Sequence, residues 1–375
     1  MRVVHFTSVH TPFDIRIFHK ECRSLAAAGY DVSFVVPHIR DEIAADVTIK
    51  AIPKSHSRLS RMTKTVWKAF RQAEKLRAEI YHFHDSELIP LALLLRFLGR
   101  KVVYDIHEDV PRDILSKDYL PRRLRQPIAW IVERIENFSC RLFSGLVTAT
   151  PFIAERFGRL NGHTVVIHNY PRLRELAPST GVAWQQRLRA VTYVGGILPD
   201  RGIRELVTAM SLLPQDLDVT LQLAGEFFPA AFKEELSLLP GWSKVEALGL
   251  LDRTRIATLL GSVRAGIVAF LPEPNHVYAL PHKLFEYMSA GIPVIASDFP
   301  LWRKIVHDIG AGLMVDPSDP KSLADAIAFV MTHSDEAEAM GRRGREAVEK
   351  YYNWEQEQKK LLHFYSDLIE GQCAV

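Results

Sequence analysis

Short apolar runs alternate along the chain with longer amphipathic stretches. In the first half of the chain these runs span residues 3–7, 31–37, 80–84, 101–106, 145–150 and 165–168. In the second half they span residues 190–194, 219–224, 245–248, 265–270 and 294–296. Strands of a buried parallel sheet form such continuous runs, and helices alternate with them along the chain. The pattern predicts an α/β protein with two Rossmann-like, doubly wound domains.

The composition becomes irregular between the two halves, after Asn169-Tyr170-Pro171 and as far as Gly181, as expected for a linker. We therefore predict a first domain at residues 1–172, a linker at 173–189, a second domain at 190–353 and a final helix at 354–375. Two consecutive halves of this kind predict two facing domains with a cleft between them.

One strand-loop-helix-strand unit in the second half carries the clearest chemical pattern. The run at residues 265–270 is followed by a polar loop at 273–281 and by a helix from about His282 to Ala290, which Gly291 ends. In an open parallel sheet, ligands bind beyond the carboxyl ends of the strands. The loop and the start of this helix therefore lie where a ligand would bind.

The start of this helix carries groups that bind an anion. Pro281 suits an early helix position, because its missing N–H needs no partner there, and the N–H groups after it can hold an anion. Lys283 adds a positive charge, and Glu286, about one turn further, can accept hydrogen bonds from sugar hydroxyls. These groups predict a site for a nucleoside diphosphate with its ribose. The alternative is that both are ordinary solvated helix residues.

A second anion-binding pattern follows the run at residues 190–194. Gly195 and Gly196 allow the backbone to approach a phosphate, and Arg201 can bind phosphate oxygens through two N–H groups. The opening of the first domain lacks the G-x-G-x-x-G pattern that indicates a dinucleotide cofactor, and no G-x-x-x-x-G-K-[ST] phosphate loop occurs in the sequence.

Histidines and carboxylates gather at the ends of two strands of the first domain. His84 and Asp85 end one apolar run, and His107, Glu108 and Asp109 end the next. A lone histidine is more often structural. Two histidines at adjacent strand ends, each beside a carboxylate, favour a ligand site.

Two basic features also lie in the first half. Arg16 and Lys20, one helical turn apart, either reach an anionic ligand or form a solvated face. Residues 54–77 contain eight Lys or Arg and one acidic residue, around a helical apolar stripe of Leu59, Met62, Val66, Phe70 and Ala73. Such a helix either lies on an anionic membrane surface or packs on the sheet. A second basic cluster, which would extend the same face, consists of Arg122, Arg123 and Arg125.

The segment PHKLFEYMSAGIPVIAS, residues 281–297, resembles the nucleotide-sugar-binding segment of the retaining glycosyltransferases of family 4. In that family two glutamates, separated by seven residues, end this loop and helix. Glu286 matches the second glutamate, which binds the ribose hydroxyls. Tyr278 occupies the place of the first, which contacts the donor sugar, and Glu273 or Asn275 is the expected replacement.

The resemblance covers the whole chain and is strongest in the second half. It implies the two-domain fold called GT-B, in which the final helix crosses back to the first domain; the alternative is a terminal helix on its own domain. It also implies transfer of a sugar, with retention, from a nucleoside diphosphate to an acceptor hydroxyl. The leaving phosphate then accepts the proton, and no metal ion or cofactor is expected.

The family holds the donor diphosphate with an arginine and a lysine. Arg201 replaces the lysine and keeps its charge, whereas Gly196 stands where the arginine is expected. Lys283, or Arg16 from the opposite domain, is therefore the expected second cation. His107 matches a histidine that lies beside the donor sugar in the family.

These assignments give three groups of predicted site residues. The catalytic residues are His107, Arg201 and Lys283. The donor-binding residues, in the second domain, are Gly195, Gly196, Arg201, Gly225, Gly249, Leu250, Asn275, Tyr278, Leu280, Pro281, Lys283, Leu284 and Glu286. The acceptor-binding residues, in the first domain, are His10, Asp14, Arg16, His84, Asp85 and Glu108.

Composition and charge exclude several classes of protein. The net charge of +3 over 375 residues is too small to indicate a nucleic-acid-binding protein. Cys22, Cys140 and Cys373 are odd in number and far apart, which favours reduced thiols in the cytoplasm. The sequence shows no signal peptide and no apolar stretch long enough to span a membrane. We expect a cytoplasmic protein, peripheral on the inner face of the cell membrane through residues 54–77.

The favoured setting is transfer to a lipid-linked saccharide during synthesis of a bacterial surface polysaccharide. This follows from the family resemblance together with the basic helix. Two alternatives stay open. One is a nucleotide-sugar epimerase of the same fold. The other is a non-catalytic, membrane-associated scaffold, which Tyr278 and Gly196 would favour.

Overall fold

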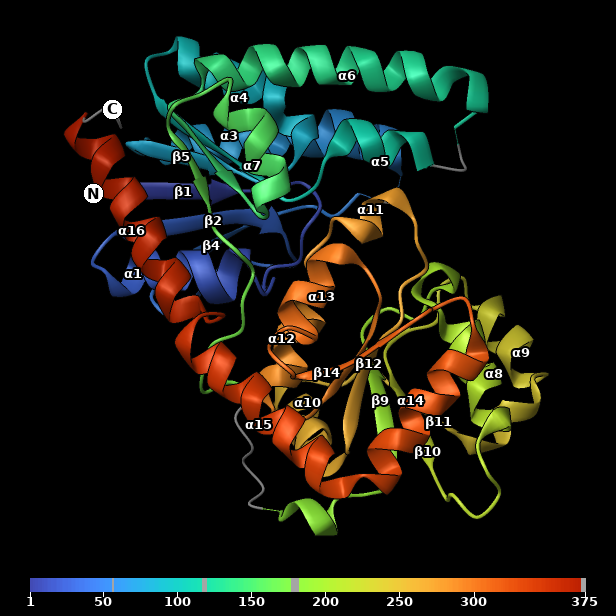
Figure 1. The fold of residues 1–375 in the computed structure, drawn as a ribbon. Coiled ribbons are helices and arrows are strands. Elements are labelled where there is room, and N and C mark those ends of the chain that lie inside the picture. The colour runs from blue at the N-terminus through green and yellow to red at the C-terminus, as the bar shows by residue number, and fades with distance from the viewer. Residues whose placement is uncertain (56, 117–119, 177–181, 372–375) are drawn as a thin grey trace. The chain divides into compact units, whose positions relative to one another are not determined.

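The computed structural model describes residues 1–55, 57–116, 120–176 and 182–371. Contacts within the chain divide it into two compact units, Met1–Asn169 together with Gln356–Val375, and Tyr170–Glu355. Each unit contains one mainly or wholly parallel sheet covered by helices (Figure 1). The prediction of two doubly wound α/β domains is therefore confirmed.

The sheet of the first unit has eight strands in the order β3-β4-β2-β1-β5-β6-β7-β8. Its pairs are parallel except for the edge pair of β3 and β4. The strands are β1 Arg2–Phe6, β2 Asp31–Pro37, β3 Glu42–Ala44, β4 Val47–Ile52, β5 Ile80–Phe83, β6 Lys101–Ile106, β7 Gly145–Thr148 and β8 Thr164–Val166. Because β1 lies between β2 and β5, the carboxyl ends of β1, β5 and β6 are neighbours at one edge.

Helices cover both faces of this first sheet. Figure 1 shows α3, α4 and α6 on one face, with α1 and α16 on the other. The helices are η1 Ile17–Cys22, α1 Arg23–Ala27, α2 Arg58–Ser60, η2 Arg61–Thr65, α3 Val66–Lys75, η3 Ser86–Leu88, α4 Ile89–Phe97, α5 Val110–Ser116, α6 Arg122–Leu142, α7 Pro151–Gly158 and α16 Trp354–Glu370.

The sheet of the second unit has six parallel strands in the order β11-β10-β9-β12-β13-β14. They are β9 Ala190–Val194, β10 Thr220–Ala224, β11 Val245–Gly249, β12 Ala265–Val268, β13 Val294–Ser297 and β14 Gly312–Val315. The helices are η4 Trp184–Gln186, η5 Pro199–Arg201, α8 Ile203–Leu212, α9 Ala231–Ser237, η6 Pro240–Lys244, α10 Arg253–Ser262, α11 Pro274–Val277, α12 His282–Ser289, α13 Pro300–Val306, α14 Pro320–Thr332 and α15 Ser334–Lys350.

The predicted unit around α12 forms as expected, with one addition. Strand β12 leads to a loop, α12 starts at His282, and Gly291 follows its end with a φ of +68°. The loop is not wholly irregular, because Pro274–Val277 form the short helix α11. Pro281 is the residue before the first helical one, with a ψ of 127°, and not a residue of the first turn.

The described parts of the predicted linker, residues 173–176 and 182–189, belong to the second unit. Leu176 and Trp184 are buried in the hydrophobic core of that unit. The final helix α16 begins in the second unit, and its residues from Gln356 onward belong to the first. There the fully buried Tyr365 places its hydroxyl 2.8 Å from His82 Nδ1 on β5.

Within the basic segment at residues 54–77, the helical part runs from Arg58 to Lys75, and it does not form one continuous solvent-facing stripe. Val66, Phe70 and Ala73 of α3 are buried in the core of the first unit, as the packing alternative predicts. Leu59 and Met62, one to two turns earlier, are exposed. The apolar stripe is therefore divided between the core and the surface.

Two of the three cysteines are seen in this structure. Cys22 and Cys140 are buried free thiols, and Cys373 lies outside the described residues. Within the described part of the chain, none of the helices has the length and the apolar character that crossing a bilayer requires.

Candidate active site

Two cations of the second unit lie on one aromatic ring. The guanidinium carbon of Arg201 is 4.2 Å from the centre of the Phe270 ring, and Lys283 Nζ is 5.3 Å from it. Lys283 Nζ also lies 5.0 Å from the centre of the Tyr193 ring. Ring faces attract cations but do not neutralise them. The pair therefore keeps its positive charge for another partner.

Lys283 is buried, although the alternative interpretation made it a solvated helix residue. Its side chain bears no ion pair to the described carboxylates at salt-bridge distance, and burial together with the charge of Arg201 lowers its pKa to about 8. Among the described carboxylates, Asp200 makes a weak contact with Arg201, whose Nε lies 3.7 Å from Asp200 Oδ1. Asp200 is itself shared with His276, whose Nε2 lies 3.3 Å from Asp200 Oδ2. An anion placed beside Lys283 and Arg201 would restore the charge balance.

Two glycines, Gly195 after β9 and Gly225 after β10, lie where a side chain would meet a close neighbour. Gly195 has a φ of +122°, and a Cβ there would lie 2.8 Å from Lys283 Nζ. A Cβ on Gly225 would overlap the carbonyl oxygen of Gly195. Side chains at either position would displace the loop from the ammonium group. The pair of loops after β9 and β10 thus forms a surface of bare backbone next to the cation.

Glu286 is also buried, and an arginine holds its carboxylate. Arg253 Nη1 on α10 donates to Glu286 Oε1 at 2.7 Å, and Arg253 Nε donates to Glu175 Oε1 at the same distance. Burial lowers the pKa of Arg253, but the charge of Glu286 and the bond to Glu175 outweigh it and raise the pKa. Glu286 is therefore a hydrogen-bond acceptor held in place by Arg253, on the same helix as Lys283.

The other predicted donor-binding residues of the second unit differ in their exposure to solvent. Gly196, Gly249, Leu250 and Tyr278 are exposed, and Leu280 and Pro281 are partly exposed. Leu284 is a correction, since its side chain is fully buried in the core and its N–H bonds to the carbonyl of Pro281 at 3.1 Å. The side chain of Asn275 lies outside the described residues, and Glu273 is exposed. The structure therefore joins Gly195, Arg201, Gly225, Lys283 and Glu286 into one site.

In the first unit, His107 at the end of β6 is held by a buried carboxylate. Its Nε2 lies 2.7 Å from Asp105 Oδ2, and its ring is partly exposed. Burial raises the pKa of Asp105, but the charge of Arg16 and the bond to His107 outweigh it, so the pKa lies well below its ordinary value. An ionised Asp105 accepts a hydrogen bond from His107 Nε2–H, which fixes the ring orientation and tautomer.

Arg16 is not available to an anionic ligand, contrary to both predictions made for it. It is buried and donates to Asp105 through Nε at 2.9 Å and Nη2 at 2.8 Å, and to the carbonyl of Ile167 at 2.8 Å. Lys20 is buried as well and donates to Asn169. Both cations therefore stabilise the first unit internally, which excludes Arg16 as the second cation of the diphosphate site.

Two predicted acceptor-binding residues are also buried in this network. His84 Nε2 lies 3.0 Å from His5 Nδ1, and its Nδ1 lies 3.2 Å from Asp105 Oδ2. Asp85 accepts hydrogen bonds from the hydroxyl of Thr7 and the N–H of Ser8, both at 2.7 Å. These side chains position their neighbours and do not face a ligand.

His10, in contrast, is partly exposed beside His107, with ring centres 5.2 Å apart. Its Nδ1 lies 3.2 Å from Asp85 Oδ1. Burial lowers the pKa of His10, but the hydrogen bond and charge of Asp85 outweigh it and raise the pKa. Asp14 caps the first helix by accepting from the N–H groups of Arg16 and Ile17, and Glu108 is exposed. His10 and His107 are thus the reactive side chains that this edge presents.

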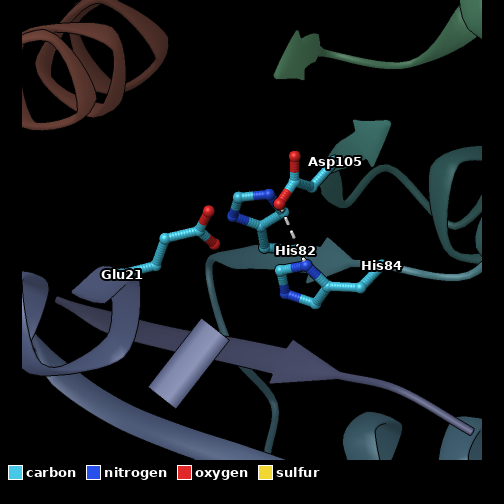
Figure 2. A group of neighbouring side chains, drawn as sticks. All are labelled: Glu21, His82, His84 and Asp105. Carbon is cyan, nitrogen blue, oxygen red and sulfur yellow. Dashed lines mark hydrogen bonds and ion pairs between the residues drawn. The ribbon is translucent and has the colours of Figure 1, made fainter. Parts of the chain in front are cut away.

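Behind these histidines lies the buried cluster in Figure 2, formed by Glu21, His82, His84 and Asp105. One ligand atom from each side chain lies within 4.8 Å of the others, a spacing that a metal ion could use. However, Arg16 Nε lies 3.1 Å from Glu21 Oε1 and 2.9 Å from Asp105 Oδ2. Its guanidinium already supplies the positive charge. Burial and the charge of Asp105 raise the pKa of Glu21 well above its ordinary value.

Sequence reasoning missed Arg253, Glu175 and Asp105 as parts of these sites. Asp105 had a signal, because an acidic residue within the apolar run KVVYDI must find a buried partner. Arg253 and Glu175 had none, since they lie 33 and 111 residues from Glu286 and only the fold brings them together.

Family models match most of the chain. Residues 16–170 match the model described as Glycosyltransferase Family 4, and residues 181–347 match the model described as Glycosyl transferases group 1. The MMP alpha-(1->4)-mannosyltransferase of Mycolicibacterium hassiacum is 26% identical over 302 residues, which are 78% of this chain and 71% of that protein. The phosphatidyl-myo-inositol mannosyltransferase of Mycobacterium leprae is 27% identical over 227 residues, 58% of this chain and 57% of that protein.

Solved structures share the fold over nearly the whole chain. Sucrose-phosphate synthase from Thermosynechococcus elongatus has a TM-score of 0.79 at 20% identity, covering 99% of this chain and 100% of that one. Anabaena HepE in complex with UDP and glucose has a TM-score of 0.73 at 14% identity, covering 98% and 100%. WaaG, a glycosyltransferase involved in lipopolysaccharide biosynthesis, has a TM-score of 0.73 at 16% identity, with the same coverage. This chain belongs to the family 4 glycosyltransferases and has the GT-B fold.

Proposed function

We propose that this glycosyltransferase moves a sugar, with retention and without a metal ion, from a nucleoside-diphosphate sugar to an acceptor hydroxyl. The observation that carries the proposal is the pair of the buried Lys283 and the partly exposed Arg201 on Phe270, beside the Gly195 backbone and one helical turn from Glu286. A diphosphate would bind the two cations, and a ribose would donate its hydroxyls to Glu286.

The main barrier to transfer is departure of the diphosphate while positive charge grows on the anomeric carbon. Fixed cations lower this barrier, because they stabilise the leaving group without reorganising. Lys283 and Arg201 would serve this purpose in place of a metal ion. The leaving phosphate oxygen would take the proton from the acceptor hydroxyl on the same face of the sugar, so that configuration is retained.

His107 is the proposed contact to the transferred sugar. Because Asp105 receives its Nε2–H, the Nδ1 lone pair is left as an acceptor for a sugar hydroxyl. The neighbouring His10, whose pKa is raised, would hold an anionic or hydroxyl group of the acceptor. Asp85 and Asp105 therefore act by positioning these two histidines.

The proposed acceptor is a lipid-linked saccharide of a bacterial surface polysaccharide, used at the cytoplasmic face of the cell membrane. Two observations support this setting. The Mycobacterium leprae relative is named for a phosphatidyl-myo-inositol acceptor, and WaaG for lipopolysaccharide biosynthesis. Basic side chains at residues 58–75, among them Lys64, Lys68 and Arg71, would approach an anionic membrane surface.

A panel of donors tests the proposal. Thermal midpoints of the purified protein are measured with UDP-, GDP- and dTDP-sugars and with the free diphosphates, and nucleotide release is measured with and without a membrane lipid extract. The expected result is stabilisation by one donor and release only with the extract. Conversion of the nucleotide sugar into its epimer without an acceptor and without net nucleotide release would favour an epimerase. No stabilisation by any donor or diphosphate would overturn the nucleotide-sugar site.

EDTA and stereochemical analysis test the two finer claims. We expect the same transfer rate in EDTA as in added Mg²⁺ or Mn²⁺. The new glycosidic bond should show the same anomeric configuration as the donor by NMR. A rate that falls in EDTA and returns with a divalent ion would contradict the metal-independent mechanism.

A further inference from the structure

Exposed apolar side chains concentrate on two neighbouring helices of the first unit. On α6 the side chains of Leu124, Ile131, Ile135 and Phe138 are 49% to 57% exposed. On α4 and the residue after it, Phe97 and Leu98 are more exposed still. Isolated apolar side chains are normal on protein surfaces, but a contiguous group marks a binding surface.

The four residues of α6 lie on one face of the helix. They follow one another at intervals of seven, four and three positions, each of which returns to the same side. The residues that α6 buries, Ala129, Glu136, Ser139 and Cys140, lie on a different face. The exposed stripe is therefore a second apolar face, which the fold of the first unit does not use.

Helices α4 and α6, which carry these exposed side chains, are neighbours. They pack together, as Figure 1 also shows. Arg96 Nε at the end of α4 donates to the carbonyl of Leu142, the last residue of α6, at 2.7 Å. This bond joins the end of α4, where Phe97 and Leu98 lie, to the end of α6, one turn beyond Phe138. We call these six exposed apolar residues of α4 and α6 the α4–α6 surface.

Arginines border the stripe along α6. Arg123, Arg134 and Arg141 are exposed and recur after eleven and seven positions, which places them along one edge. Trp130 lies on the same edge, with the Arg134 guanidinium 5.3 Å from its ring centre. The two carboxylates of α6 form ion pairs with Arg156. Its Nη2 lies 2.8 Å from Glu136 Oε2, and its Nε lies 4.0 Å from Glu133 Oε1. The edge is therefore basic as well as apolar.

We propose that the α4–α6 surface inserts into the interfacial layer of a bilayer containing anionic lipids. Apolar side chains enter such a layer while arginines bind the lipid phosphates and tryptophan lies at headgroup level. A second copy of the chain fits less well, since an antiparallel two-fold contact along α6 would bring the arginine edges of like charge together. The proposal does not rest on sugar transfer, and it assigns the apolar contact to α4 and α6 and not to residues 54–77.

Vesicle binding without any donor or acceptor tests the proposal. The intact protein is sedimented with vesicles of phosphatidylcholine alone and with vesicles that also contain phosphatidylglycerol. We expect binding only to the second, weakened by salt. The variant I131Q/I135Q should bind at least about tenfold more weakly, and R123Q/R134Q/R141Q should bind weakly with a reduced salt dependence.

Controls make each outcome decisive. Ile39→Gln removes an apolar side chain that is 90% exposed elsewhere on the first unit and should leave binding unchanged. F97Q/L98Q supplies a second apolar variant if I131Q/I135Q loses its thermal midpoint. Wild-type binding that I131Q/I135Q and F97Q/L98Q leave intact would overturn the proposal. A second outcome would also overturn it. The wild type would then elute as a dimer in size-exclusion chromatography and bind no vesicles, and I131Q/I135Q would elute as a monomer.

Discussion

The two units both bury cations, but they treat the charges in opposite ways. In the first unit, Arg16 lies between Asp105 and Glu21, and hydrogen bonds extend from Asp105 to His84 and His107. In the second unit, the buried Lys283 shares an aromatic ring with the partly exposed Arg201, whose Nε lies 3.7 Å from Asp200 Oδ1, and Lys283 has no ion pair with a described carboxylate. Burial alone therefore does not identify a binding site. The incomplete charge balance in the second unit indicates where a ligand completes the structure.

The largest expected effect comes from breaking the balanced network. Arg16→Met leaves Asp105 buried without its guanidinium and should lower the free energy of unfolding by about 3–5 kcal/mol. Urea unfolding followed by circular dichroism measures the change. Arg23→Met, at an exposed arginine seven residues on, should change stability by less than about 0.5 kcal/mol. Equal effects of the two substitutions would show that Arg16 does not stabilise the first unit in this way.

Lys283→Met should lower the transfer rate without lowering stability, the reverse of what is expected for Arg16→Met. Loss of this cation removes stabilisation of the leaving group, so the transfer rate should fall by about 10²–10³-fold. The free energy of unfolding should stay the same or rise, because a buried charge without an ion pair is removed. Initial rates and urea unfolding are measured together, with the exposed Lys304→Met as the control. A large loss of stability would mean that Lys283 belongs to a balanced network after all.

Arg253→Met should reduce both donor binding and stability, each by a moderate amount. It frees the carboxylate of Glu286 from its 2.7 Å partner, and we expect donor affinity to fall about tenfold, with about 1–3 kcal/mol lost in stability. Isothermal titration with the donor measures the affinity. Arg255→Met, at an exposed position of the same helix, should leave both quantities unchanged. Unchanged donor affinity in Arg253→Met would separate Glu286 from ribose binding.

The smallest effect is a pH dependence that Lys283 should give to donor binding. Its pKa is about 8 in the folded protein and 10.5 ordinarily, so the ammonium that binds the diphosphate is lost above pH 8. Donor affinity should fall by up to about tenfold per pH unit from there. The unfolded chain binds more protons between pH 8 and 10.5, so the contribution of Lys283 to stability rises over the same window. Lys283→Met should abolish both trends.

Much of the second unit was predictable because its signals are local in sequence. Pro281 and Gly291 mark the ends of α12, and Lys283 and Glu286 lie three positions apart, which places them on one face. Leu284 was wrongly assigned, because the next residue along a helix turns about 100° away, here into the core. The resemblance named a binding segment without separating its core positions from its ligand positions.

The first unit was harder to predict because its partners are distant in sequence. Arg16 and Asp105 are 89 positions apart, and a charged residue in an amphipathic pattern is ordinarily assigned to the surface. Only the pairing of β1, β5 and β6 brings His5, His84 and Asp105 together. Sequence reasoning found the edge of the sheet correctly. It could not distinguish the side chains that are exposed at this edge from the buried side chains that hold the exposed ones in position.

The final helix has a consequence for the order in which the protein is made. Contacts of Tyr365 with His82, and of Lys101 with the carbonyl of Leu368, involve residues from the two ends of the chain. They can form only after translation has passed the whole second unit. During synthesis, the second unit therefore has its complete sequence outside the ribosome before the first unit does. A nascent chain stopped before residue 356 would leave the buried histidines of the first sheet without their last partner.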